Sequence, residues 1–318
     1  VNNGGSLILG DDSVVDVNVS YIPTGYYTYN ALLMADGEGT SIENKGDITS
    51  HGVYSVIRAD NGSEVSNSGD ILVYATSSNS SEDRAAITRA SGEGSAVHNK
   101  AGGDITLISD QTPQGSGGIE VYPLKWYTHT FYAMMASDYG DVVNDEGATI
   151  HLQGAGVYGV TASRGKALNE GNIYLDGLVP TLDDENNITS TSYWQPSSLY
   201  LTSSGMVAGS TDADGDATAI NTGNITVNNA GFGMMALNGG TAINQGVITL
   251  TADDGVTGQA DELVGMAALN GGVVINDTSG VINIDADYGQ AFLSDSSSYI
   301  INNGSINLNG SPMDDTDS

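Results

Sequence analysis

A pattern of nine apolar and polar positions recurs along the chain: apolar, any residue, Asn, any residue, Gly, any residue, Ile, any residue, apolar. Clear copies begin at Ile42 (IENKGDITS), Val65 (VSNSGDILV) and Ala242 (AINQGVITL). The shortest spacing between two copies is 23 residues, which fits one coil of a β-solenoid. The repeated asparagines are Asn44, Asn67, Asn99, Asn144, Asn169, Asn221, Asn244, Asn276 and Asn302. We therefore expect each copy to belong to one coil of a stack.

Each copy contains a strand in which apolar and polar residues alternate. The isoleucine and the apolar residue two places later are expected to point inward, while the residues between them face solvent. The inward isoleucines would be Ile48, Ile71, Ile105, Ile150, Ile173, Ile225, Ile248, Ile282 and Ile306. Because one coil cannot bury its own apolar face, neighbouring coils are required. This predicts an all-β fold, a right-handed parallel β-helix.

A second apolar segment precedes each Asn by about eight to ten residues and ends in a small residue. The small residues are Ala35, Ala59, Ala90, Ala136, Ala162, Ala208, Ala236 and Ala268. Each coil is therefore expected to hold two or three short strands, which Gly, Asn and Asp turns separate.

The repeated Asn and Gly are expected to shape one turn of the coil. The Asn side chains would form a ladder, bonded to the local backbone and to the Asn one coil away, although a role as ligand residues is the alternative. The Gly two residues later suggests a positive φ or a tight corner. The segment NNGGSLIL from Asn2 is interpreted as a degenerate first copy of the repeat.

Extra residues account for the longer spacings between copies. They fall between the isoleucine strand and the next apolar segment, and two of these insertions are long enough to hide another coil. They span residues 10–25, 74–83, 109–130, 176–203 and 251–262. Because they enter at one corner, they are expected to project from one side, which is often the binding side of a repeat protein. We assign residues 1–310 to a single β-helix domain and residues 311–318 to an acidic tail.

The amino-acid composition limits the classes of molecule that this chain can bind. Asp and Glu number 39 against 8 Lys and Arg, for a formal net charge of −31. Phosphate recognition relies on clustered Lys and Arg, so nucleic acid and anionic membranes are poor partners. The chain has no cysteine, which excludes disulfides and thiolate zinc sites. No apolar run approaches the roughly 18 residues of a membrane span, so this segment is not expected to be inserted in a membrane.

The outward side of the isoleucine strands is the predicted ligand-binding groove. The insertions begin just past these strands and would wall in a polar floor. The predicted floor residues are Asp47, Asp70, Asp104, Asn172, Tyr174 and Asn224, and the wall residues are Lys125, Trp126 and Trp194. Such a mixture suits glycans, which need hydrogen-bond donors, acceptors and rings on which sugars stack. The alternatives are an ordinary solvated face and aromatic residues that fold back over the coil.

A second candidate surface is the column that comes just before the repeated alanines. The residues of this column that we expect to form the surface are Met34, Arg58, Arg89, Met135 and Met235. If this column faces outward, it forms a semi-apolar stripe suited to a protein partner. If it faces inward, it is core.

Signals for metal binding and catalysis are weak. Asp212, Asp214 and Asp216 alternate as at the start of a calcium loop, but no distal Glu follows, and a solvated acidic turn is the alternative. No other cofactor is expected. Neither an opposed carboxylate pair nor a base for a polysaccharide lyase stands out, and the histidines match no nucleophile motif. We therefore expect a protein that is not an enzyme.

The repeated N-x-G-x-I-x-L coil, the absence of cysteine, the acidity and the abundance of Gly, Asn and Thr resemble the passenger domains of AIDA-type autotransporter adhesins. Within that family the chain looks most like members whose coil is interrupted by aromatic-bearing loops. The resemblance implies export through an outer-membrane barrel that is not part of this sequence, and display on the bacterial surface. It implies adhesion to host glycans such as glycosaminoglycans, or to matrix proteins such as fibronectin. The alternatives are self-association in aggregates and biofilms, and a polysaccharide lyase or hydrolase.

Overall fold

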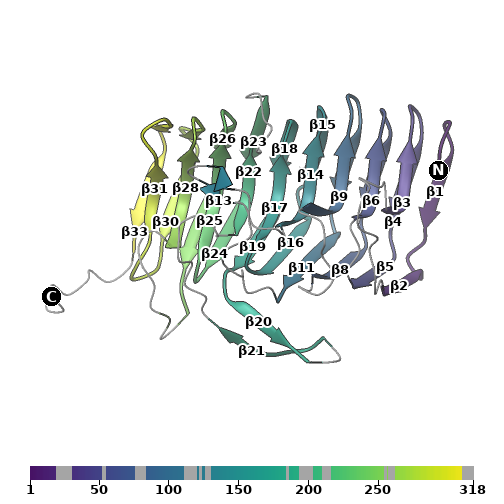
Figure 1. Cartoon of the computed structure of the whole chain (residues 1–318), viewed down its shortest axis with the longest axis horizontal. Coiled ribbons are helices and arrows are strands. Elements are labelled where there is room, and N and C mark those ends of the chain that lie inside the picture. The colour runs from purple at the N-terminus through teal and green to yellow at the C-terminus, as the bar shows by residue number, and fades with distance from the viewer. Residues whose placement is uncertain are drawn as a thin grey trace, which may run out of the picture.

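Three long parallel sheets run the length of the computed structural model, and each complete coil contributes one strand to each sheet (Figure 1). The stack begins with β1 at one end and finishes with β33 at the other. The structure describes residues 1–18, 31–51, 55–75, 84–110, 120–121, 124–125, 130–183, 186–192, 203–209, 216–253, 256 and 262–309. The predicted all-β solenoid, a parallel β-helix, is confirmed.

We name the sheets A, B and C in the order in which a coil visits them. Sheet A consists of β3 (Ala31–Asp36), β6 (Ser55–Asp60), β9 (Arg84–Ser91), β14 (Thr130–Ser137), β17 (Val157–Ala162), β22 (Ser204–Ala208), β25 (Gly231–Leu237), β28 (Leu263–Leu269) and β31 (Gln290–Ser294). Sheet B consists of β1 (Ser6–Leu9), β4 (Ser41–Asn44), β7 (Glu64–Asn67), β10 (Ala96–Asn99), β15 (Gly140–Asn144), β18 (Gly165–Asn169), β23 (Ala217–Asn221), β26 (Thr241–Asn244), β29 (Val273–Asn276) and β32 (Tyr299–Asn302). Sheet C consists of β2 (Val14–Asn18), β5 (Asp47–His51), β8 (Asp70–Ala75), β11 (Asp104–Ser109), β16 (Thr149–Gly154), β19 (Asn172–Asp176), β24 (Asn224–Asn228), β27 (Val247–Thr251), β30 (Val281–Ile284) and β33 (Ser305–Leu308).

The isoleucines fill the interior as predicted. From Ile48 to Ile282, all eight are at most 1% exposed, and each pairs with the next across sheet C. Ile306 in the last coil is 39% exposed, because no described coil stacks on it. On sheet A the predicted small residues from Ala35 to Ala268 are fully buried, so the apolar segment before each Asn is a third strand of the coil.

The predicted asparagine ladder is confirmed at the turn between sheets B and C. Each Asn side chain donates its Nδ2 hydrogen to the Oδ1 of the next Asn, over 2.7–2.9 Å, in an unbroken series from Asn44 to Asn302. Nδ2 also donates to local carbonyls, as from Asn67 to Gly69. The ladder lacks a member before Asn44, where Leu9 occupies the register, and the buried Oδ1 of Asn44 has no hydrogen-bond partner.

A glycine stands two residues after six of the nine ladder asparagines, all except Asn99, Asn144 and Asn276, and the corner itself requires it. Of the two predicted reasons, a positive φ is wrong: these glycines have ordinary φ values. The tight corner is confirmed, because a Cβ at this position would collide with backbone of the preceding coil. At Gly223, for example, it would meet the carbonyl oxygen of Gly171. Glycine is therefore needed for close packing of one turn on the next.

Two interpretations of the repeat need correction. The first copy is out of register: Ser6–Leu9 pairs with Ser41–Asn44 in sheet B, and the first strand of sheet C is Val14–Asn18, inside the predicted insertion at residues 10–25. The long spacings hide no further coil, because the ladder steps directly from Asn99 to Asn144 and from Asn169 to Asn221.

The insertions follow a sheet C strand and precede a sheet A strand, as predicted. Two of them contain antiparallel hairpins: β12 (Glu120–Val121) with β13 (Leu124–Lys125), and β20 (Val179–Leu182) with β21 (Ile188–Ser192). The second hairpin projects from the body of the stack (Figure 1). Within the described residues, no helix is long and apolar enough to cross a membrane. The predicted tail at residues 311–318 lies outside the described residues.

Candidate functional site

The outer face of sheet C brings the predicted floor residues together. Asp70, Asp104, Thr149, Asn172 and Asn224 follow one another in register at the start of successive strands, and Asp47 begins the strand before them. Tyr174 lies in the next outward column, two residues after Asn172. The parallel register therefore builds a polar surface that runs along the stack, although each coil contributes only a few residues to it.

Two stacked histidine–tyrosine pairs stand on this face and were not predicted as part of the site. The rings of His51 and Tyr74 lie 5.0 Å apart at an interplanar angle of 3°, and those of His151 and Tyr174 lie 5.2 Å apart at 14°. Tyr174 remains 43% exposed, because its other neighbour in the ladder is the smaller Thr226. His151 and Tyr174 therefore provide an exposed flat platform on a polar sheet, whereas His51 and Tyr74 are half-buried.

Hydrogen bonds hold His151 and Asp104 together across neighbouring strands. The His151 Nε2 lies 3.4 Å from the Asp104 Oδ2, and the Thr106 hydroxyl donates to the Asp104 Oδ1 over 2.9 Å. Burial would raise the pKa of Asp104, but these bonds from His151 and Thr106 outweigh it and lower that pKa. Asp104 therefore stays ionised and orients the His151 ring beside Tyr174.

Asp70 has the opposite electrostatics. Burial raises its pKa, and the carboxylates of Asp104 and Asp47 on either side raise it further. A row of like charges on adjacent strands is unfavourable. The sheet tolerates this row because the side chains reach solvent. A ligand that donates hydrogen bonds to these carboxylates would reduce their repulsion.

These opposite shifts predict opposite effects of two matched substitutions. Asp70 is favoured in its protonated form, so its contribution to stability is lost as the pH rises through its raised pKa. Asp104 contributes stability above its ordinary pKa, which is lost as the pH falls through the lowered value. At neutral pH, Asp70→Asn should raise the free energy of unfolding and Asp104→Asn should lower it, each by about 0.5 kcal/mol.

Urea unfolding at pH 7 and at about pH 3 checks this prediction. The gain from Asp70→Asn should vanish at the acidic pH, where wild-type Asp70 is protonated. A change of the same sign for both variants at neutral pH would contradict the assignment of the two environments.

Little of the predicted walls of the groove belongs to the described structure. Trp126 and Trp194 lie outside the described residues. Lys125 belongs to the short strand β13, where only its backbone pairing with Glu120 is described. The structure thus gives the positions of the floor residues but not of the wall side chains. Binding by the wall residues stays a prediction.

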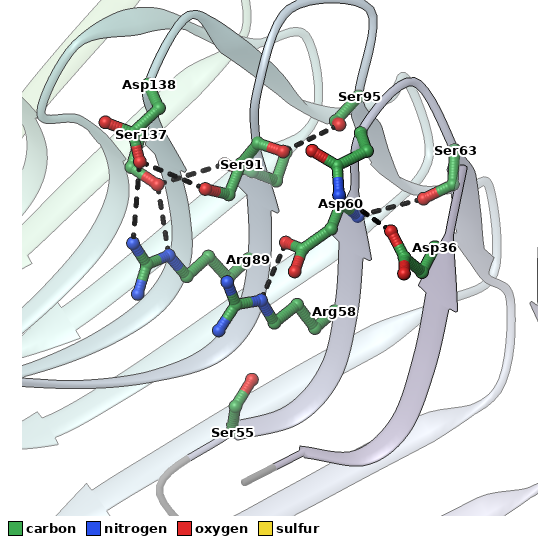
Figure 2. A network of polar contacts seen from close by, with 12 residues as sticks. Asp36, Ser55, Arg58, Asp60, Ser63, Arg89, Ser91, Ser95, Ser137 and Asp138 are labelled. Carbon is green, nitrogen blue, oxygen red and sulfur yellow. Dashed lines mark hydrogen bonds and ion pairs between the residues drawn. The ribbon is translucent and has the colours of Figure 1, made fainter. Parts of the chain in front are cut away.

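The N-terminal part of the predicted protein-partner stripe is a polar network on the outer side of sheet A. Figure 2 shows Arg58 and Arg89 side by side on adjacent strands, where they are register partners. The Arg58 Nε lies 2.7 Å from the Asp60 Oδ1, and the Arg89 Nε donates to the Ser137 Oγ over 3.0 Å. The Asp138 Oδ2 lies 4.0 Å from the Arg89 Nη2, so a neighbouring carboxylate balances each guanidinium group, and Arg58 is only 8% exposed.

The apolar part of the stripe also faces away from the coil interior, yet it is covered. Met135 and Met235 are 7% and 5% exposed and belong to small apolar clusters separate from the main core, while Met34 is half-buried. The outward orientation is one of the two predicted arrangements. Because most of the column is buried, binding of a protein partner there stays a prediction.

The predicted calcium loop is described only at its last residue. Asp212 and Asp214 lie outside the described residues, whereas Asp216 is exposed and accepts a hydrogen bond of 3.4 Å from the Tyr139 hydroxyl. Over the part of the chain that the structure describes, no three His, Asp or Glu side chains are grouped so that they could hold a metal ion. Calcium binding therefore stays a prediction.

Comparison with known proteins gives a family and a fold. A family model described as the BigA third pectate lyase-like domain matches residues 1–280, and it agrees with the β-helix seen here. A crystal structure of a TibA fragment, hyper-glycosylated in a reaction catalysed by TibC, is similar over 95% of this chain and 100% of that chain. The two are 14% identical, with a TM-score of 0.17. At that TM-score the similarity carries no argument about the site.

Proposed function

Because the chain belongs to the BigA third pectate lyase-like domain family, we propose that it is a non-catalytic module of a bacterial surface adhesin, which binds host glycans on the outer face of sheet C. The observation that carries the proposal is the pair of stacked His–Tyr platforms on an exposed polar face. Sugars bind proteins by stacking a ring face on an aromatic side chain while their hydroxyls find donors and acceptors nearby.

The neighbours of Tyr174 supply both kinds of polar group. Asn172 and Asn224 join through a side-chain hydrogen bond of 3.0 Å, in the outward column beside it. Thr226 provides a hydroxyl in the same column as the ring, and Asp104 provides carboxylate oxygens beside His151, the ring on which Tyr174 stacks. Amide, hydroxyl and carboxylate groups that face solvent around one ring support a glycan rather than an apolar ligand.

Charge favours an uncharged glycan. The described residues of this face include no Lys or Arg, while Asp47, Asp70 and Asp104 are acidic. A polyanionic glycosaminoglycan would meet repulsion from these carboxylates and from the net charge of −31. We therefore place neutral glycans, including those carried by matrix glycoproteins such as fibronectin, ahead of glycosaminoglycans.

The decisive experiment compares wild type with Tyr174→Ala on an array of neutral and sulfated glycans. Wild type should bind neutral glycans, and the variant should lose about tenfold in affinity, because an aromatic platform contributes on the order of 1–2 kcal/mol. The matched control is Tyr139→Asn, which removes another exposed tyrosine at a turn where φ is 70° and Asn is tolerated.

Two results would contradict the proposal. Equal binding by wild type and Tyr174→Ala would remove the platform from the site. Release of unsaturated products from uronate polymers would show instead an enzyme with the chemistry of a polysaccharide lyase.

A further inference from the structure

A second exposed surface lies on the outer face of sheet B, away from the proposed glycan site. The side chain just before each ladder asparagine points outward there, and the strands are in direct register. Over the last six coils this position is always aliphatic. The aliphatic stripe consists of Val143, Leu168, Ile220, Ile243, Ile275 and Ile301.

The fold does not require aliphatic residues at this position. In three earlier coils of the same column the residues are Glu43, Ser66 and His98. Most of the stripe is half-buried, since each side chain is shielded by the coils above and below, and Ile301 in the last coil is 44% exposed. An antiparallel or parallel sheet face exposed to water normally carries polar residues, so a continuous apolar row points to a partner.

Cations occur only near the first coils of the stripe, where Arg164 precedes β18 and Lys166 lies on β18 two residues before Leu168. No Lys or Arg follows Lys166 in the chain. The column beside the stripe holds Asp141 and Lys166 on its first two strands and is uncharged on the other four, with Thr218, Thr241, Val273 and Tyr299. Acidic residues border the stripe on both sides.

The carboxylates of Glu170 and Asp277 follow the ladder on one side, and those of Asp216 and Asp295 precede the strands on the other. A hydrogen bond of 2.9 Å from Gln245 lowers the pKa of Asp277, so that border keeps its charge.

From this geometry we infer that the aliphatic stripe is a docking surface for a cationic amphipathic helix of another protein, whose apolar face covers the stripe and whose Lys and Arg flank it. Five steps of about 4.8 Å give the stripe a length of about 24 Å. A helix of about 16 residues has that length, and its turns repeat at nearly the spacing of the coils. A second copy of this chain is a poor occupant, because its acidic borders would oppose these.

A model peptide tests the inference. The probe is an 18-residue leucine–lysine helix with lysines along both borders of its apolar face, and the reference is a scrambled peptide of the same composition. Wild type should bind the amphipathic peptide about tenfold more tightly than the scrambled one, because only the first presents an apolar face. Isothermal titration calorimetry measures both affinities.

Matched variants locate the binding. Ile243→Thr with Ile275→Thr should abolish the preference for the amphipathic peptide, since threonine keeps the β-branched shape but not the apolar surface. The control, Val247→Thr with Val281→Thr, changes half-buried outward residues of sheet C on the same two coils and should keep the preference. Glu170→Gln with Asp277→Asn leaves the stripe intact and should weaken binding about threefold.

Three outcomes would overturn the inference. In the first, wild type binds both peptides equally, which means general charge attraction. In the second, the isoleucine variant folds with an unchanged melting temperature and keeps the preference. In the third, analytical ultracentrifugation shows a wild-type dimer that the isoleucine variant dissolves, which assigns the stripe to a second copy.

Discussion

Replacing Asn169 with alanine, in the middle of the ladder, is expected to lower the free energy of unfolding by about 3–5 kcal/mol. Asn169 is fully buried, accepts a hydrogen bond of 2.8 Å from Asn144 and donates one of 2.8 Å to Asn221. The substitution leaves the amide of Asn144 and the carbonyl oxygen of Asn221 without these partners inside the stack. Each buried polar group that loses its partner costs about 1–3 kcal/mol.

The exposed Asn224 provides a matched control. Its side chain makes one ladder-like bond of 3.0 Å to Asn172, but on the solvent side of sheet C, where water can replace the lost partner. Asn224→Ala should therefore cost less than about 1 kcal/mol. Urea unfolding followed by circular dichroism compares the two variants. Hydrogen exchange at the neighbouring coils adds a local readout, since long repeat arrays can unfold in parts.

Equal costs for the two alanine variants would mean that the ladder bonds contribute little beyond solvent-exposed ones. A much smaller cost for Asn169→Ala would mean that a water molecule enters the space and satisfies both neighbours.

The sequence predicted the features that recur in every coil. The isoleucine column, the small residues of sheet A and the asparagine ladder each occupy the same position in successive copies, so one alignment places them all. A coil in the middle of the stack has two neighbours and must satisfy both of them. Its sequence is therefore constrained strongly enough to be recognised.

The first coil was assigned to the wrong strands because the constraint on coils in the middle of the stack is weaker there. Among the described coils it pairs with one neighbour, and its ladder position holds Leu9 instead of Asn, while the segment from Asn2 imitates the motif in the wrong sheet. The stacked pairs on sheet C were missed because each partner is ordinary in its own copy. The signal was present: His51 and Tyr74, like His151 and Tyr174, are separated by 23 residues, the shortest coil length.

The repeat pattern could not predict that the protein-partner stripe on sheet A is largely buried. The pattern of Met135 and Met235 shows that they alternate with core residues, and the structure places them outside the main core. Whether an outward residue is exposed depends on what lies over the sheet, and the register within the coil holds no information on that point.

The second large effect is expected for Gly223→Ala. A Cβ at this position would lie 2.6 Å from the carbonyl carbon of Glu170 and closer still to the carbonyl oxygen of Gly171 in the preceding coil. Backbone cannot rotate away as a side chain can, so the two coils must separate locally and weaken the adjoining strands. We expect a loss of about 3 kcal/mol or more in the free energy of unfolding, at the upper end for overpacking.

Gly10→Ala separates this collision from the general effect of adding a methyl group. Gly10 also has an ordinary φ, and a Cβ there would meet nothing within 4 Å. Because alanine restricts the unfolded chain more than glycine does, Gly10→Ala should be neutral or should stabilise the protein by up to about 1 kcal/mol. Thermal and urea unfolding measure both variants. If Gly223→Ala were equally harmless, the turns of successive coils could spread apart at little cost, and close stacking at this corner would not explain the repeated glycine.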